Sequence, residues 1–368
     1  MRLKNHSLYT VLSATRSAGE SCDVAFHIVN FEDNRGYAIV SADRRATDVY
    51  AFSPTGNIDI DEAMDNPGFR IFMEGAAVCY GNEVDGISGA MADSLGMLLG
   101  PGGLIDLEDG SGSDNGGSGN VTDYMITYLD GVGYYTSSSG WIEDETVGPL
   151  LTTAWHQNPP YNYYCPTEDG ELCAAGCVPI AISQIMAYHK YPPVVNGYLI
   201  NWYLAVLENV EPQLHYAARV IREVGREAGS SYGVDDTSTL TTQARPTFRS
   251  FGYDAGYLEP YDEDKVFTSI IDSLPVYTRG DDIVDGGGHA WIIDGYYKSR
   301  NTSYYYNMQS PYSLHTTITE RKTYVHCNWG WGANQNCYCL EDTFVIYGDR
   351  MREIYDFENV KIIPNIHY

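Results

Sequence analysis

Cys177 stands where a thiol could be made reactive. Small residues precede it, and Val178-Pro179 opens an apolar run that predicts a helix over residues 178–188. Proline suits a first helical turn, where its missing N–H costs nothing. A helix start favours a thiolate, and its free N–H groups can hold an oxyanion. A buried structural cysteine explains this segment equally well when it is taken alone.

His289 could supply the base that a nucleophilic thiol needs. A glycine-rich turn, residues 286–288, leads into His289 and then into an apolar strand predicted over residues 290–297. Glycine lets another chain pass close by, and the strand would fix the imidazole. A purely structural histidine is the alternative, and the run of glycines makes it the weaker one.

Four further residues could support this pair. Asn328 follows a predicted strand, and an amide beside an imidazole can hold its tautomer. Trp329 and Trp331 could shield that contact from water, although the same segment could be an aromatic turn that closes a core. The side-chain N–H of Gln157 could hold an oxyanion, although a lone glutamine is more often a surface residue.

The elements that must position these residues indicate an α+β fold. Helices are predicted over residues 178–188 and 212–228, and the later part of the chain reads as strands. The predicted later strands are residues 275–278, 290–297, 304–308, 323–328 and 344–347. A helix that carries the thiol and a β region that carries the base divide the site between two lobes.

The first part of the chain reads as a smaller α+β domain. Strands are predicted over residues 24–31, 37–41 and 49–52, followed by mostly helical residues 59–80 with a break at 66–68. Residues 106–120 are rich in Gly, Ser, Asp and Asn, which indicates a flexible linker. We therefore expect one domain over residues 1–146 and a second over residues 147–368.

Composition narrows the possible partners. The formal net charge of −27 argues against binding to nucleic acid or to an anionic membrane surface. The spacing of the eight cysteines does not match structural zinc ribbons, and no motif requires a metal or cofactor. No apolar run reaches membrane-spanning length, and no signal peptide is recognisable. We expect either a cytosolic protein or one whose export signal is missing from this sequence.

The second half resembles the streptopain family of cysteine peptidases, the C10-type enzymes with a papain-like fold. The first half is similar to that family's propeptide through residues 36–47. The segments that carry the resemblance in the second half are residues 148–153, 157–162, 175–178, 184–192, 288–290, 293–295 and 328–332.

The resemblance implies a secreted or cell-surface bacterial cysteine endopeptidase that acts on proteins or peptides, with its own propeptide as intramolecular inhibitor. It implies that Cys177 attacks the scissile carbonyl, that His289 shuttles the proton, and that Gln157 and the Cys177 N–H hold the oxyanion. Gly288 would offer its backbone to the substrate. Propeptide removal would cut the chain near residues 144–147.

The sequence departs from the family in two places and leaves two other functions open. Pro179 stands where a small residue is usual, and the Tyr-rich segment 298–322 looks like a surface insertion. The same residues could serve another thiol acyl-transferase or amidase. A catalytically inactive binding protein is the third possibility, which intact Cys177 and His289 argue against.

Overall fold

The computed structural model describes residues 3–10, 24–43, 45–98, 125–129, 132–207, 211–281, 287–307, 314–345 and 359–368. Contacts group the chain into two compact units. The first contains residues 1–83, 146–297 and 323–368, and the second contains residues 84–145 and 298–322. The predicted linker 106–120 lies outside the described residues, and the predicted boundary at residue 146 stays a prediction.

The N-terminal part of the first unit is an antiparallel sheet with one long helix. Its strands are β1 (Leu3–Thr10), β2 (Val24–Phe31), β3 (Tyr37–Ser41) and β4 (Val49–Ser53). Alternating residues of β2 and β3 are buried, among them Phe26, Ile28, Tyr37 and Ile39. After the short helix α1 (Ile60–Ala63) the chain breaks, and α2 (Pro67–Leu98) begins at a proline. The predicted strands and the predicted break are confirmed.

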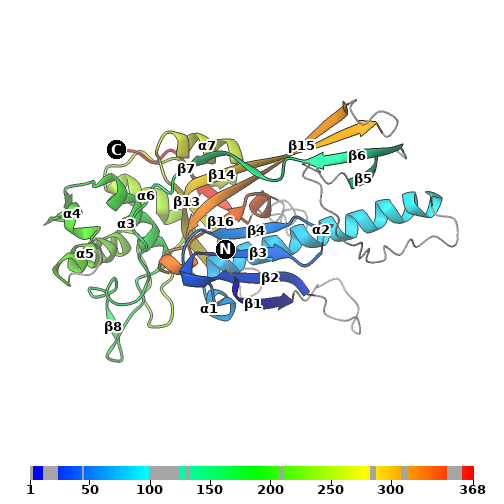
Figure 1. The fold of residues 1–368 in the computed structure, drawn as a ribbon. Coiled ribbons are helices and arrows are strands. Elements are labelled where there is room, and N and C mark those ends of the chain that lie inside the picture. The colour runs from blue at the N-terminus through cyan, green and yellow to red at the C-terminus, as the bar shows by residue number, and fades with distance from the viewer. Residues whose placement is uncertain are drawn as a thin grey trace. The chain divides into compact units, whose positions relative to one another are not determined.

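This sheet continues into the second half of the chain. Within the first unit the strand order is β1-β2-β3-β4-β16-β15-β14-β13-β17-β12, and Figure 1 shows β4 running beside β16. The strands of the second half are β12 (Glu259–Pro260), β13 (Val276–Asp281), β14 (Gly288–Asn307), β15 (Leu314–Asn328), β16 (Cys337–Leu340) and β17 (Lys361–Ile363). One hydrophobic core is therefore built from both halves, with residues of α2 and of β14 to β16 packed together.

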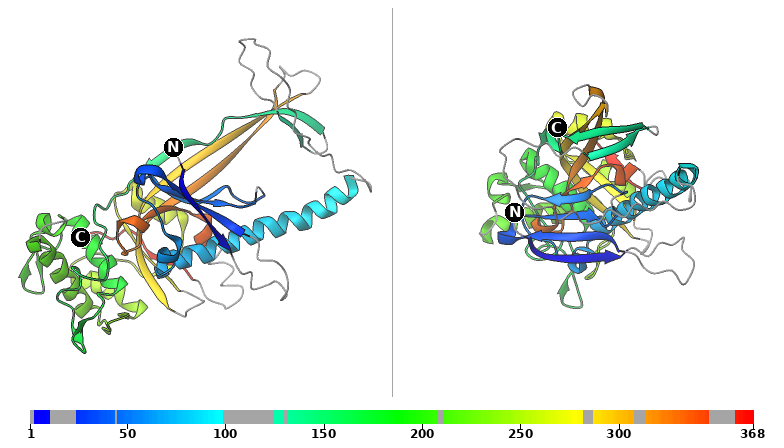
Figure 2. Two further views of the ribbon diagram at one scale, coloured as in Figure 1. Left: turned by 60° about the horizontal axis from the view of Figure 1, so that its bottom comes forward. Right: turned by 45° about the vertical axis from the view of Figure 1, so that its right-hand side comes forward.

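Helices gather at one end of the first unit, around α3 (Figures 1 and 2). They enclose a second core, in which α3 is buried along ten of its residues. The helices are α3 (Cys177–His189), α4 (Trp202–Ala205), α5 (Glu211–Glu227) and α6 (Ala244–Ser250), whereas α7 (Glu263–Ile271) packs into the first core. Two short hairpins also belong to this part, β8 (Thr167–Glu168) with β9 (Glu171–Leu172), and β10 (Val194–Val195) with β11 (Tyr198–Leu199).

The second unit includes the last residues of β14 and the first residues of β15. Its strands β5 (Met125–Leu129) and β6 (Val132–Ser138) pair with each other, and β6 pairs with residues 303–307 of β14. Strand β7 (Ile142–Val147) has residues 142–145 in the second unit and 146–147 in the first. The Tyr-rich insertion predicted at residues 298–322 therefore forms paired strands, with residues 308–313 outside the described part.

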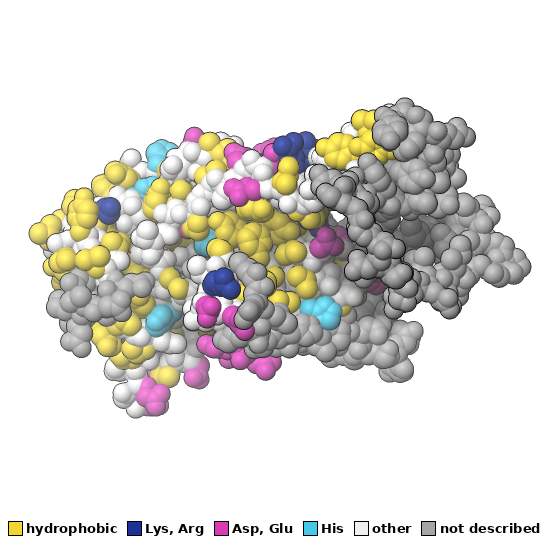
Figure 3. Space-filling model, in the orientation of Figure 1, with side chains coloured by type: hydrophobic (Ala, Val, Ile, Leu, Met, Phe, Trp, Pro, Cys, Tyr) yellow, Lys and Arg dark blue, Asp and Glu magenta, His cyan; other side chains and the backbone are white. Residues whose placement is uncertain are grey.

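The fold class is confirmed as α+β, with one error among the elements. A strand was predicted over residues 344–347, but residues 342–345 are helical, and 346–347 lie outside the described residues. No helix in the described part of the chain is long and apolar enough to cross a bilayer. Figure 3 shows many acidic side chains and few basic ones on the visible face, in keeping with the net charge of −27.

Candidate active site

Cys177 is the first residue of α3, as its sequence setting predicted. Gly176 precedes it at φ 89°, a backbone conformation that glycine adopts most readily, and a side chain there would strike Thr237 at 2.9 Å. Burial raises the pKa of the half-buried Cys177 thiol, while the Ala290 backbone N–H and the charge of Arg279 act to lower it. The fold therefore places the thiol at a helix start but does not by itself make it a thiolate.

Gln157 is held close to the Cys177 segment. Its backbone carbonyl accepts a hydrogen bond of 2.9 Å from the N–H of Ala175, two residues before the cysteine. The residue is buried. The backbone of Gln157, whose side chain is proposed as an oxyanion donor, is thus hydrogen-bonded to the segment just before α3.

His289 lies at the start of β14, as predicted, and is 1% exposed. Its Nε2 is 2.8 Å from the backbone oxygen of Trp329, and since a carbonyl only accepts, Nε2 carries the proton. Burial lowers the pKa of His289 to about 4, so the ring is neutral near pH 7. In the part of the chain that is described, no hydrogen bond joins His289 to Cys177.

The start of α2 packs directly against His289. A Cβ on Gly68 would lie 2.6 Å from Cδ2 of His289 and 2.6 Å from Cε3 of Trp329. The Asn66 side chain accepts hydrogen bonds from the N–H groups of Gly68, at 3.0 Å, and Phe69. It also donates to the side chain of Gln335 at 2.8 Å. A residue of the N-terminal half therefore fixes α2 to the turn that follows the tryptophans.

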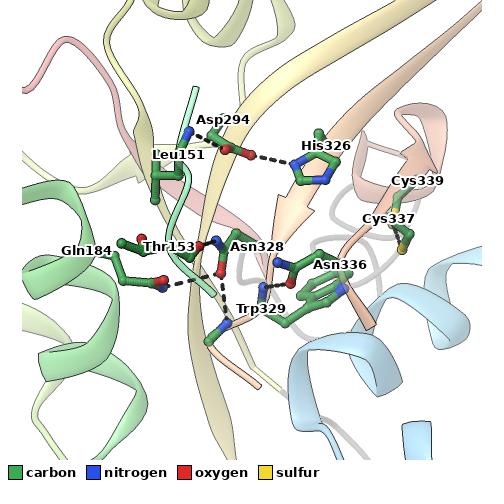
Figure 4. A network of polar contacts seen from close by, with 11 residues as sticks. Leu151, Thr153, Gln184, Asp294, His326, Asn328, Trp329, Asn336, Cys337 and Cys339 are labelled. Atoms are coloured by element: carbon green, nitrogen blue, oxygen red, sulfur yellow. Dashed lines mark hydrogen bonds and ion pairs between the residues drawn. The ribbon is translucent and has the colours of Figure 1, made fainter. Parts of the chain in front are cut away.

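Asn328 contacts residues other than His289. Its Nδ2 donates to the Thr153 carbonyl at 2.7 Å, and its Oδ1 accepts from Gln184 Nε2 at 3.2 Å (Figure 4). The N–H of Gly330 donates to the same Oδ1 at 3.3 Å. The Asn328 side chain thus links β15 to α3 and to the segment that contains Thr153. The backbone oxygen of Trp329, not the Asn328 side chain, contacts the imidazole.

Trp331 lies beside His289, and Trp329 contacts the imidazole through its backbone oxygen. Trp329 is fully buried, and the Trp331 ring centroid is 6.0 Å from that of His289. Trp291 stacks on the same imidazole, with centroids 6.4 Å apart. The imidazole thus lies near two indole rings and against the start of α2.

Gly288 lies just before His289 and is exposed. A Cβ there would lie 2.3 Å from Nη2 of Arg279. Arg279 in turn donates to Oδ1 of Asp281 at 2.6 Å. A side chain at residue 288 would have to displace the ends of Arg279 and Asp281, so glycine leaves this ion pair undisturbed.

Sequence reasoning missed a buried pair behind the site. Nδ1 of His326 is 2.6 Å from Oδ1 of Asp294, and Oδ2 of Asp294 accepts from the N–H of Leu151 at 2.9 Å (Figure 4). Burial acts to lower the pKa of His326, but the Asp294 carboxylate outweighs it and raises that pKa. Both residues stand in predicted strands, and a charged residue within an apolar strand was the signal that could have revealed the pair.

The fold and these residues define a two-part protein, in which a thiol begins a helix, an imidazole lies at the start of a strand, and the N-terminal domain packs on the imidazole. Residues 155–209 and 200–339 match the Peptidase C10 family, and residues 2–77 match the Spi protease inhibitor domain. The chain belongs to the Peptidase C10 family, which confirms the predicted family and the presence of an N-terminal inhibitor-type domain.

The chain is also similar to known proteins, with low sequence identity to each. Streptopain from Streptococcus pyogenes serotype M28 (strain MGAS6180) and from serotype M1 are each 23% identical over 282 residues, 60% of this chain and 64% of theirs. Prointerpain A of Prevotella intermedia, as a fragment, aligns with a TM-score of 0.55 at 18% identity over 97% of this chain and 98% of that one. The last comparison supports the fold assigned above.

Proposed function

We propose that this chain is the inactive precursor of a secreted cysteine endopeptidase, with Cys177 as nucleophile and His289 as base. One observation carries the proposal: the start of α2, within the inhibitor-type domain, packs on His289 while its Nε2 bonds to the Trp329 carbonyl. This is the arrangement expected if the first domain holds the base away from the thiol.

In the mature enzyme His289 takes the proton of Cys177, and the sulfur attacks the carbonyl carbon of the scissile peptide bond. The oxyanion that forms is held by the N–H of Cys177 and the side chain of Gln157. His289 then gives its proton to the leaving amine, which leaves a thioester on Cys177. Water hydrolyses the thioester with His289 as base and frees the thiol.

Latency follows from the setting of His289. Burial disfavours the imidazolium that proton transfer from the thiol creates, and between the described residues no hydrogen bond joins the unprotonated Nδ1 of His289 to Cys177. Removal of α2 removes the contact between Gly68 and the His289 ring. His289 can then leave the Trp329 carbonyl and turn toward Cys177.

The maturation cut is proposed near residues 144–147. The side chains of β7 are exposed up to Val147, where exposure is intermediate. Just beyond it, the N–H groups of Leu150 and Leu151 bond to the backbone and side-chain oxygens of Asp294 at 2.8 and 2.9 Å. A cut before Gly148 would leave a new N-terminus that is already fixed to β14. Strand β7 pairs with β14, so it must separate locally before it can be cleaved.

The decisive experiment follows the mass of the purified precursor in the presence of reductant, beside the Cys177→Ala variant. The wild-type chain is expected to lose about its first 146 residues, and Cys177→Ala to remain intact. Maturation of pure Cys177→Ala without added enzyme would overturn the assignment.

Two measurements separate this function from the alternatives. Cleavage of casein after loss of the N-terminal domain indicates a peptidase, whereas transfer to an added amine without cleavage indicates another thiol acyl-transferase. An epoxide inhibitor that fails to modify Cys177 in the mature chain would favour an inactive binding protein.

A further inference from the structure

Three cysteines that the proposed reaction does not use share one face of β15 and β16. Cys327 lies opposite Cys337 in the antiparallel ladder, and Cys339 lies two residues further along β16. Residues two apart in a strand point to the same face, so the three thiols form a cluster. Sγ of Cys337 is 3.4 Å from Sγ of Cys339, and Figure 4 shows the two side chains next to each other. None is more than 1% exposed.

The N-terminal domain covers this cluster. Tyr37 of β3 lies against Cys337, and its hydroxyl oxygen is 3.4 Å from the backbone oxygen of Gln335. Strand β4 pairs with β16, with Ala51 opposite Cys339. Tyr37 and Ala51 both lie within residues 2–77, the part that matches an inhibitor domain. Removal of the propeptide therefore takes away both the ring over Cys337 and the strand beside β16.

The three thiols differ in acidity. Burial acts to raise the pKa of Cys337, but hydrogen bonds from Cys339 and Tyr37 bring it below its ordinary value. Burial raises the pKa of Cys327 and of Cys339. Because the thiolate is the attacking form in disulfide exchange, Cys337 is the most nucleophilic of the three.

Strand geometry selects the partner of Cys337. Directly opposed residues of antiparallel strands have Cα atoms about 4.5–5.5 Å apart, inside the range that a disulfide spans. Residues two apart along one strand have Cα atoms about 6.6 Å apart, close to the upper limit for a disulfide. Cys327 thus fits as the bonding partner, whereas Cys339 fits as the hydrogen-bond donor to the reactive sulfur.

We propose that Cys327 and Cys337 form a redox modification site that propeptide removal uncovers, and that small disulfides such as oxidised glutathione oxidise it. This inference rests on the proposed maturation. The Cys337 thiolate attacks one sulfur of the small disulfide, breaks its S–S bond and releases one thiolate. The Cys327 thiol loses its proton to water, attacks the mixed disulfide and releases the second. Two protein thiols become one disulfide, and the small disulfide becomes two thiols.

The new bond would join β15 to β16 beside the turn that carries Trp329. Since the Trp329 backbone contacts His289, the disulfide would fix one wall of the site after maturation. The precursor, with Tyr37 and β4 in place, is protected from this oxidation.

The test compares the Cys177→Ala precursor, intact and after its propeptide has been removed by added wild-type enzyme. Mass spectrometry first checks that the propeptide has been removed, so that failed maturation is distinguished from failed oxidation. If the wild-type enzyme does not cleave the precursor, a glutamyl endopeptidase is used in its place. Both forms are treated with oxidised glutathione and then unfolded in the presence of N-ethylmaleimide, which labels the free thiols. They are then digested with trypsin. The tryptic peptide of residues 323–350 contains Cys327, Cys337 and Cys339 and no other cysteine.

The mature form is expected to show a disulfide and one N-ethylmaleimide adduct in this peptide, and the precursor three adducts. A matched pair of variants identifies the bond: Cys327→Ser should abolish it, and Cys339→Ser should retain it. Three adducts in the mature form, equal oxidation of the precursor, or a disulfide that survives Cys327→Ser would each overturn the proposal.

Discussion

Replacing Gly68 by alanine should weaken the hold of the N-terminal domain on His289. The added Cβ would lie 2.6 Å from carbon atoms of both His289 and Trp329, whereas carbon atoms in contact lie about 3.5–4.0 Å apart. Both rings are buried and have little room to retreat, at 1% and 0% exposure. The start of α2 must therefore move away by about 1 Å, or the two rings must shift.

The size of the effect can be bounded with a control on the same helix. Overpacking of this kind costs about 1–3 kcal/mol, while alanine gains up to about 1 kcal/mol over glycine in a helix interior. Gly81 of α2 has no atom within 4 Å of the added Cβ, so Gly81→Ala reports the propensity gain alone. The difference between the two variants should be about 1–3 kcal/mol, which is about 5- to 140-fold in the equilibrium for propeptide release.

Two assays in the Cys177→Ala background measure this difference. Urea unfolding gives the loss of stability, and the rate of cleavage by a trace of mature enzyme gives the population of the released state. In the wild-type background, Gly68→Ala should mature sooner than Gly81→Ala. Equal stability and equal cleavage rates for the two variants would refute the contact as the source of latency.

Three further outcomes follow from the buried polar groups. Lowering the pH from 6.5 to 4 should destabilise the Cys177→Ala precursor by up to about 3 kcal/mol through His289. Burial lowers the pKa of His289 to about 4 in the folded chain, so over this pH range the unfolded chain binds a proton that the folded chain does not. Urea unfolding at several pH values, with His289→Gln as the flatter comparison, checks this. Asp294→Asn should lower the pKa of His326, seen by NMR titration, and should cost most stability below pH 6.5, where the ion pair is complete. Asn328→Ala should cost about 1–3 kcal/mol in urea unfolding, because it leaves buried partners unpaired.

Local patterns were enough to predict where the thiol and the imidazole stand. The small residues before Cys177 and the proline after it specify a helix start through local backbone preferences. The glycines before His289 lead into an apolar strand in the same way. These features depend on residues within a few positions of each other, so a single sequence contains them.

Side-chain partners far apart in sequence could not be read in this way. Asn328 was expected to orient His289, yet its amide reaches Thr153 and Gln184, 175 and 144 residues away. Which carbonyl or amide meets a given side chain depends on how strands and helices pack, and many partners satisfy the same amide. The helical turn at residues 342–345 was missed for a related reason: Phe344 and Val345 favour a strand locally, but the turn packs Phe344 into the shared core.

Latency and stability are coupled in the proposed precursor because inhibitor and peptidase share one sheet and one core. Strand β4 extends the peptidase sheet at β16, and α2 contributes Phe69 and Phe72 to the core that holds Trp291 and Trp329. An inhibitor that only plugged a cleft could leave without exposing the core of its host. Here release uncovers the edge of β16 and the wall around His289 together, so the step that frees the base also removes apolar burial and strand pairing. Maturation must therefore be driven by cleavage that makes release irreversible, rather than by a small shift in a binding equilibrium.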